Sequence, residues 1–427
     1  MNSPLAATGT ARLLESLSPL IPDSFINELL PPAKHPGRRN ILSAAQLYRT
    51  HLLAVLTPVH SFNGLARLLP EQRSWRAFAH IHHRHRTPDV RMLHEFRARA
   101  GVAGLRRINE HLLSPLLKVA AHHPHSVAII DATDLPASTA DKKKTVAAGR
   151  RDEPVWVPVR SKPVTLGFFV GYKKHTLRLW LSDYPAAVLL VPLVSWAAPA
   201  HVPEGYLLKP SLHHCYQRFQ WQPAIVTGDL GYIHQATKKE IRERWQVAVV
   251  TKLKSDMNIV EPFDAWDQVS CQHGQGLRWL GYHSPEQSHW FGVPPGESLC
   301  ACCWEASGCP REFAYPASLH ETLLGLLPLN TIVAKKLLKQ VRSWIEPTQS
   351  FEKNILGLSQ VFFNSLRLTW TMSLLADAVT LLRAQALLMR PKEENLLQRL
   401  LPRQLDLELD GLEQIRTEKT KDPSSIQ

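Results

Sequence analysis

The stretch SVAIIDATD, residues 126–134, is a short run of apolar and β-branched residues that ends in two aspartates. Such a run between polar segments is typical of a buried β-strand. The stretch PAIVTGD, residues 223–229, has the same form and also ends in an aspartate. Helical periodicity follows in QATKKEIRERW, and QVAVVTK after it predicts another strand. Strands that alternate with helices in this way predict an α/β or α+β domain built on a mixed sheet.

Composition and pattern divide the rest of the chain into segments around this sheet. Two strands joined at GYKKH are predicted within residues 164–183, and two alternating runs separated by the turn-like SPEQ predict a small β-rich insertion further on. We expect five segments: basic helices in 1–120, the first part of the sheet domain in 121–254, a β-rich insertion with cysteines in 255–325, the second part of the sheet domain in 326–395, and a charged helix with a disordered tail in 396–427.

The charge of the chain points to a polyanionic partner. The 427 residues carry a formal net charge of +13, and 44% are hydrophobic, which indicates a folded protein. Between Lys34 and Arg107 there are 14 Lys or Arg and three acidic residues, so we expect nucleic acid to bind there. An anionic membrane surface is the alternative, but the longest apolar run, residues 187–199, is too short to span a bilayer and contains Pro192. The start of the chain has no signal-peptide pattern, which predicts a cytoplasmic protein.

Two aspartates stand where such a sheet usually carries its active site. Asp131 ends the apolar part of the first stretch, and Asp229 directly follows the second. A carboxylate at a strand end is held rigidly and faces an open crevice. With a third carboxylate from a helix, the two would form an oxygen-lined site that suits Mg²⁺. Asp134 is an alternative to Asp131, but three residues further along a strand it should lie on the opposite face.

The third carboxylate is expected in VRSWIEPTQSFEK, residues 341–353. There Arg342, Glu346 and Lys353 follow one another at steps of four and seven residues, which on a helix places one carboxylate and two cations on one stripe. Arg342 can grip a phosphate with two hydrogen bonds, and Lys353 can add a point charge. The stretch therefore predicts a metal-binding carboxylate flanked by two DNA contacts.

Two features of this stretch leave alternatives open. Glu352 could supply the carboxylate in place of Glu346, although it lacks the Arg and Lys spacing. Pro347 follows Glu346 directly, and proline is well tolerated in the first turn of a helix. We therefore expect the helix to begin near Glu346, with Arg342 on the segment before it.

The order of these elements resembles the DDE transposases of bacterial insertion sequences. In that family an RNase H-like domain, a mixed five-stranded sheet with flanking helices, carries one Asp on the first strand, one after the fourth strand, and a Glu on a later helix. IIDATD, IVTGDLGY and residues 341–358 occupy those places. The resemblance covers roughly residues 120–365 and implies metal-binding roles for Asp131, Asp229 and Glu346.

One branch of the family has a signature of Tyr, Arg, Glu and Lys. Arg342, Glu346 and Lys353 keep its spacing, whereas Lys339 stands at the position of the Tyr. GYKKH, residues 171–175, resembles a strand element that recurs between the two aspartates. The resemblance thus predicts these DNA-binding residues: Arg342, Lys353, Tyr172 and Lys173.

The resemblance implies a metal-dependent enzyme that binds the terminal inverted repeats of its mobile element, cleaves DNA and transfers the cut ends to target DNA. It implies two Mg²⁺ or Mn²⁺ ions, a homodimer in the synaptic complex, and association with the nucleoid without membrane contact. Two rivals share part of this chemistry: an RNase H-like nuclease without strand transfer, and a catalytically decayed DNA-binding protein.

The cysteines form a separate cluster in the β-rich segment. Cys300 and Cys303 have the C-x₂-C spacing of a zinc site, and four thiolates can hold one tetrahedral Zn²⁺. A structural zinc would stabilise a small segment that has little core of its own. Free thiols are the alternative, and Cys302, His273 and His289 could replace a ligand. The predicted zinc ligands are Cys271, Cys300, Cys303 and Cys309.

Overall fold

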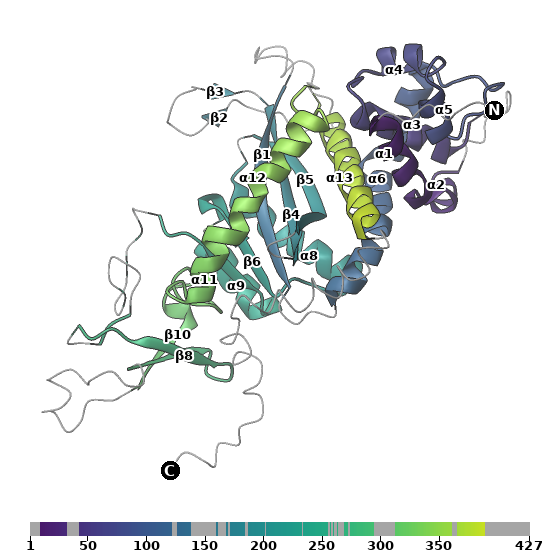
Figure 1. Ribbon diagram of the computed structural model, residues 1–427. Coiled ribbons are helices and arrows are strands. Elements are labelled where there is room, and N and C mark those ends of the chain that lie inside the picture. Colours follow the sequence, from purple (N-terminus) through teal and green to yellow (C-terminus); the bar gives the residue numbers. More distant parts are fainter. Residues whose placement is uncertain are drawn as a thin grey trace, which may run out of the picture.

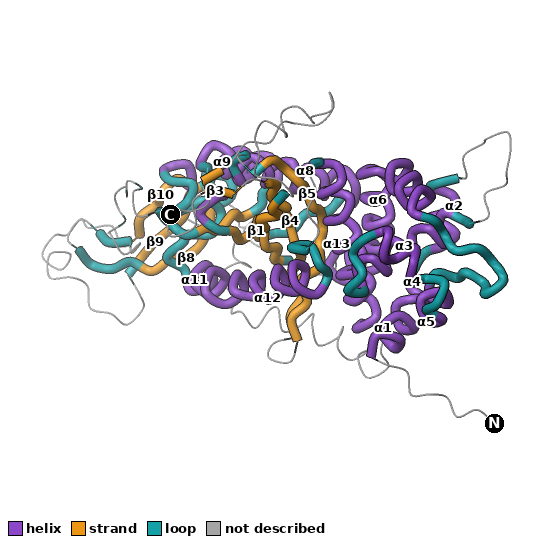
Figure 2. Tube along the Cα trace, turned by 90° about the horizontal axis from the view of Figure 1, so that it is seen from above, coloured by secondary structure: helices purple, strands orange, loops and turns teal. Residues whose placement is uncertain are grey.

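The computed structural model describes most of the chain. Figure 1 shows the N-terminal helices at one end, a sheet with flanking helices in the middle and a second, smaller sheet at the other end, and Figure 2 shows the same order from above. The described residues are 9–31, 42–121, 126–137, 159–160, 168–169, 171–183, 187–200, 202–232, 234–254, 257, 259, 263, 269–271, 274–293, 312–360 and 365–388.

A mixed five-stranded sheet with helices forms the centre of the molecule, so the prediction of a mixed α/β fold is confirmed. Across the sheet the strand order is β5-β4-β1-β6-β7. β4 runs antiparallel to both β1 and β5, while β6 is parallel to β1 and β7 is parallel to β6. The strands are β1 (Val127–Pro136), β4 (Gly171–Asp183), β5 (Ala187–Pro199), β6 (Ile225–Gly228) and β7 (Ala248–Thr251).

β4 is one continuous strand, so the prediction that GYKKH joins two strands is wrong. Along its whole length it pairs with β5, which lies at the edge of the sheet. Pro192 of β5 stands opposite Arg178, where the register shifts by one residue. An edge strand with a bulge tolerates proline because the missing N–H is not needed by a further neighbour. Residues 168–169 (β3, Phe168–Phe169) pair instead with β2 (Val159–Arg160) in a separate ribbon.

Two hydrophobic cores cover the two sides of the sheet. On β1, Ala128 and Ile130 belong to the first core, whereas Val127 and Ile129 belong to the second. The alternation follows from the two-residue period of a strand. The first core includes α8 (Leu208–Phe219) and α9 (Gln235–Trp245), and the second includes the helical segment that begins with α11 (Ile332–Lys336). Asp131, two residues after Ile129, therefore lies on the side of α11.

The N-terminal helices share the first core with the sheet. Side chains of this core come from α1, α3 and α6 as well as from β1, β4 and β5. The last helix, α13, packs against α6, α3 and β5, and the amide of Asn109 donates to the carbonyl of Leu374 across the α6–α13 interface. The helices are α1 (Gly9–Leu17), α2 (Asp23–Leu29), α3 (Ala44–Leu56), α4 (Phe62–Leu68), α5 (Arg73–Phe78), α6 (Val90–Ala121) and α13 (Leu366–Leu388).

Local sequence signals explain several helix ends. Ser43 and Gln46 form a capping box at the start of α3, and the Thr331 hydroxyl accepts the backbone N–H of Ala334 at the start of α11. Within α6, Gly101 has a φ of 55° and interrupts the helical backbone. Glycine adopts that conformation without the steric cost that a side chain would add, so α6 is two helices joined at a kink.

The segment with Glu346 is a continuous helix, and the prediction that a helix begins near Glu346 is wrong. Helical turns run without a break from Ile332 to Ile355, and Figure 1 shows them as one long rod across the sheet. Pro347 lacks an N–H and so cannot make the usual i−4 bond. The helix changes its winding on both sides: π-helical turns lie at 337–341 and 351–355, on either side of α12 (Ile345–Ser350).

A second, smaller sheet lies within residues 255–325, where the sequence predicts a β-rich segment. Its antiparallel order is β10-β9-β8, and the β8–β9 hairpin turns at SPEQ as predicted. Tyr282 and Phe291 of this sheet join the second core. The strands are β8 (Arg278–His283), β9 (Ser288–Gly292) and β10 (Glu312–Pro316).

Candidate active site

Asp131 and Asp229 lie side by side in the middle of the sheet, where the parallel pairing of β1 with β6 ends. The parallel register pairs Ile130 of β1 with Gly228 of β6, and an aspartate follows each of these residues. Asp229 comes directly after β6, whereas β1 continues past Asp131 to Pro136 against β4, so the prediction that Asp131 ends its strand is wrong. β1 and β6 are the first and fourth strands of this sheet in chain order. The backbone N–H of Gly231 donates to Asp229 Oδ1 at 2.8 Å, and that of Ala132 donates to Asp131 Oδ1 at 2.8 Å. The two carboxylates therefore lie next to each other, as predicted.

The electrostatics of the pair favour a cation. The pKa of Asp131 is raised to about 6, mainly by burial and also by the negative charge of Asp229, against the lowering effects of the Ala132 N–H and of the charge of Arg342. Asp134 lies on the opposite face of β1, exposed, with Lys173 Nζ at 4.0 Å. Between the two alternatives, the structure brings Asp131 to Asp229 and turns Asp134 away.

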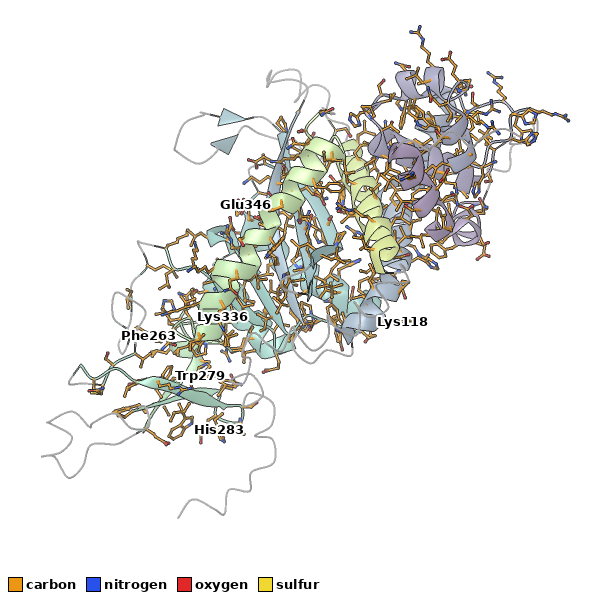
Figure 3. The ribbon with its side chains drawn as sticks, viewed as in Figure 1. Lys118, Phe263, Trp279, His283, Lys336 and Glu346 are labelled. Atoms are coloured by element: carbon orange, nitrogen blue, oxygen red, sulfur yellow. The ribbon has the colours of Figure 1, made fainter. Side chains whose placement is uncertain are left out.

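The long helix approaches the aspartates through Arg342 and Gln349. The half-buried Gln349 donates its amide N–H to Asp131 Oδ2 at 3.0 Å and lies 3.2 Å from the carbonyl oxygen of Ala132. Glu346 is exposed on the same helix, as Figure 3 shows. Among the described residues, no three His, Cys, Asp or Glu side chains come close enough to hold one metal ion. Glu346 is thus near the site on α12 but does not join the two aspartates in this conformation.

Glu352, the alternative to Glu346, is fully buried in a network of charges. Lys174 Nζ donates to Glu352 Oε2 at 2.8 Å and to Asp377 Oδ1 at 2.7 Å, and Arg178 Nη2 donates to Glu352 Oε1 at 2.8 Å. Burial opposes ionisation of Glu352, but Arg178 and Lys174 hold its pKa well below its usual range. The four side chains join the end of the long helix to β4 and α13. Both oxygens of Glu352 are used by this network, so we assign it a structural role.

The other predicted DNA-binding residues lie in different environments. Tyr172 is 1% exposed and packs with Ala197 and Leu366, so in this structure it presents no surface to DNA. Lys173 is largely buried and donates to Glu204 at 2.7 Å. Lys353 is half-buried at the end of the long helix. DNA contact by these side chains stays a prediction.

The structure adds two residues that the sequence did not single out. Tyr232 is buried beside the aspartates: burial raises the pKa of its hydroxyl well above its usual value, and the charges of Glu204, Asp131 and Asp229 add to this. Its hydroxyl lies 3.1 Å from His175 Nδ1. Gln349 is the other residue. It lies three residues after Glu346, and side chains three apart on a helix share a face, so this spacing could have identified it.

The residues at this site fit a divalent cation of the Mg²⁺ type. The donors are carboxylate oxygens, which hard cations prefer. The negative charge of Asp229 raises the pKa of Asp131, and a cation between the two carboxylates would offset that repulsion. Asp131 and Asp229 could thus supply two oxygen ligands to the predicted Mg²⁺ site, and Glu346 on α12 is the candidate for a third.

The predicted zinc ligands lie mostly outside the described residues. Cys300, Cys303 and Cys309 are in this group, as are the possible substitutes Cys302 and His273. Cys271 is buried and is not in a disulfide among the described residues. His289 uses both ring nitrogens: Nδ1 accepts from Trp279 Nε1 at 3.1 Å, and Nε2 donates to the carbonyl of Gly325 at 3.0 Å. His289 is therefore not available as a zinc ligand, and the cysteine site stays a prediction.

Fold and site together define a class: a mixed α/β protein with an acidic site where the parallel pairing of two neighbouring strands ends. Residues 6–99 are similar to a family described as a transposase domain (DUF772). This match covers the N-terminal helices and less than a quarter of the chain. It supports a transposase, the class that the acidic residues predict from a different part of the chain. No curated protein matches the chain. Among the described helices, none is long and apolar enough to cross a membrane.

Proposed function

We propose that this chain is a DDE transposase with an RNase H-like catalytic domain. The observation that carries the proposal is the pairing of Asp131 with Asp229 on the first and fourth strands of the sheet, next to a helix with Arg342 and Glu346. The strand order β5-β4-β1-β6-β7 supports it, because an RNase H-like sheet is the mixed five-stranded sheet that the resemblance implies. The similarity of residues 6–99 to a transposase domain supports the same class independently.

Each site residue then has a role in cutting and joining DNA. Asp131, Asp229 and Glu346 would hold two Mg²⁺ or Mn²⁺ ions. Bound there, such ions activate an attacking water or 3′-hydroxyl and stabilise the leaving oxygen. Arg342, whose charge acts on Asp131, can grip the phosphate of the strand to be cut, and Lys353 adds a second positive charge. These two cations orient the scissile phosphate toward the carboxylates.

The N-terminal helices would bind the terminal inverted repeats. Exposed arginines are present on and after α4 and α5, in the part that resembles a transposase domain. Guanidinium groups at a surface bind phosphates and release counterions, which makes binding depend on salt. Because two ends must be cut together, we propose a homodimer in the synaptic complex. The arginines concerned are Arg67, Arg73, Arg84 and Arg86.

The test is an in vitro reaction with purified protein, Mg²⁺ and DNA that carries the element's ends. We expect Asp131→Asn, Asp229→Asn and Glu346→Gln each to lower the rates of cleavage and joining by a factor of about 100 or more, because each removes a metal-binding charge. Asp134→Asn is the matched control: it neutralises a carboxylate three residues from Asp131 on the opposite face, and it should keep wild-type activity. Metal-dependent joining that survives all three changes would contradict the proposal.

The same reaction separates the rival functions. Cleavage without joined products would indicate a nuclease that lacks strand transfer. Specific binding of the ends with no cleavage in Mg²⁺ or Mn²⁺ would indicate a decayed DNA-binding protein. For the N-terminal surface, replacing two of the four arginines by Ala should reduce the slope of log affinity against log salt by about 0.9 for each phosphate that an arginine no longer neutralises.

A further inference from the structure

Gln349 holds the Asp131 carboxylate together with the backbone. The amide N–H of Ala132 donates to Oδ1 at 2.8 Å, and Gln349 Nε2 donates to Oδ2 at 3.0 Å. Gln349 Nε2 also lies 3.2 Å from the carbonyl oxygen of Ala132. Both neighbours of this nitrogen are acceptors, so the amide must present its NH₂ group to them. The orientation of the Asp131 carboxylate is therefore fixed from two sides by neutral donors.

The same side chain ties the helix to the strand. Gln349 is three residues after Glu346, so the two are neighbours on the surface of α12. Gln349 is half-buried toward β1, whereas Glu346 is exposed. The π-helical turns at 337–341 and 351–355 set the rotation of α12 between them, and such turns often lie at functional sites. Gln349 thus adds a polar link between the helix of Glu346 and the strand of Asp131.

We propose that Gln349 is a positioning residue for the metal site. This inference rests on the proposed function, because it assigns the role through Asp131. A carboxylate oxygen has two lone pairs, so Oδ2 can accept from Gln349 and still face a cation. Hydrogen-bond partners that orient a metal-binding side chain typically change metal affinity by a factor of about 10–100 when they are removed. Gln349 acts on the metal through Asp131 and on Glu346 through the helix, without touching DNA.

The experiment measures Mn²⁺ binding to the full chain without DNA, by the electron paramagnetic resonance signal of free Mn²⁺. Gln349→Met keeps the length of the side chain but cannot donate, and we expect it to weaken Mn²⁺ binding by a factor of about 10 or more. Ser350→Ala removes an exposed hydroxyl from the next position of the helix and should change the affinity less than about twofold, because the Ser350 hydroxyl is bonded to Asn354 and not to Asp131. A thermal melt without metal checks that each variant is folded.

A second measurement distinguishes positioning from a general loss of structure. In the cleavage reaction, Gln349→Met should need about 10 times more Mg²⁺ for half-maximal rate and approach the wild-type rate at saturating Mg²⁺. Wild-type protein that binds no Mn²⁺, or binds it equally after Asp131→Asn, would overturn the proposed metal site and this inference with it. Wild-type protein that binds Mn²⁺ through Asp131, with Gln349→Met unchanged in affinity and in Mg²⁺ dependence, would overturn the role of Gln349 alone.

Discussion

Exchange of Glu352 for Gln removes one negative charge from the buried network and keeps the size of the side chain. In the wild type two cations, Lys174 and Arg178, face two carboxylates, Glu352 and Asp377. After the exchange two buried cations share one carboxylate, and two charge-assisted bonds of 2.8 Å are weakened or broken. At about 1.5–3 kcal/mol for each such bond, the expected loss is about 3–6 kcal/mol. Breaking a buried ion pair from one side costs about 3–5 kcal/mol, which agrees.

The assay is urea denaturation followed by tryptophan fluorescence, with Glu346→Gln as the matched control on the same helix. Glu346 is exposed, so its exchange should change the free energy of unfolding by less than about 0.5 kcal/mol while it lowers the rate of DNA cleavage by a factor of about 100 or more. Glu352→Gln should instead cause a large loss in the free energy of unfolding. A Glu352→Gln protein as stable as the wild type but inactive, beside an active Glu346→Gln protein, would refute the assignment of the two glutamates.

Two further predictions concern stability. Gly357 has a φ of 72° and its α-carbon faces the ring of His60, so Gly357→Ala should lower the free energy of unfolding by about 1–3 kcal/mol, and His60→Ala should restore part of this in the double mutant. Burial lowers the pKa of His289 to about 4, whereas in the unfolded chain its pKa is near 6.5. Between these two values the imidazole is neutral in the folded protein and protonated in the unfolded chain. Stability should therefore fall as the pH drops from 6.5 toward 4, by about 2 kcal/mol from this group at pH 5. In thermal and urea melts at pH 7 and pH 5, His289→Gln should show a smaller pH dependence than the wild type, and equal dependence would contradict the reasoning.

Elements with a strong local pattern could be predicted from the sequence. QATKKEIRERW is α9 from its first residue to its last, and the hairpin at SPEQ has its predicted turn. The apolar run before Asp131 is the first part of β1, and the run before Asp229 is β6. In each case the period of the apolar residues and a nearby turn or cap carry the information within about ten residues. The closeness of the two aspartates was expected because functional residues of such sheets gather at the carboxyl ends of the strands, although β1 itself continues beyond Asp131.

The errors arise where distant residues decide the local structure. GYKKH looks like a turn because Lys174 and His175 are polar, yet both are buried in a central strand. The partners of Lys174 are 178 and 203 residues away in the chain, so no local pattern could reveal them. The helix around Pro347 is a similar case. Val341 and Ile345 pack into the second core, and this packing keeps the backbone helical through the proline where propensity alone predicts a start.

The core that the N-terminal helices share with the sheet has a consequence for how the protein can be divided. A fragment that ends at α6 would leave Leu105, Ile108 and Leu112 without the partners on α13 and the sheet that cover them. The part that resembles a transposase domain, residues 6–99, also contributes side chains to this shared core. If this part binds a DNA end, the packed core fixes the distance between the bound DNA and Asp131. Inserting linker residues would then disrupt the packing instead of lengthening that distance.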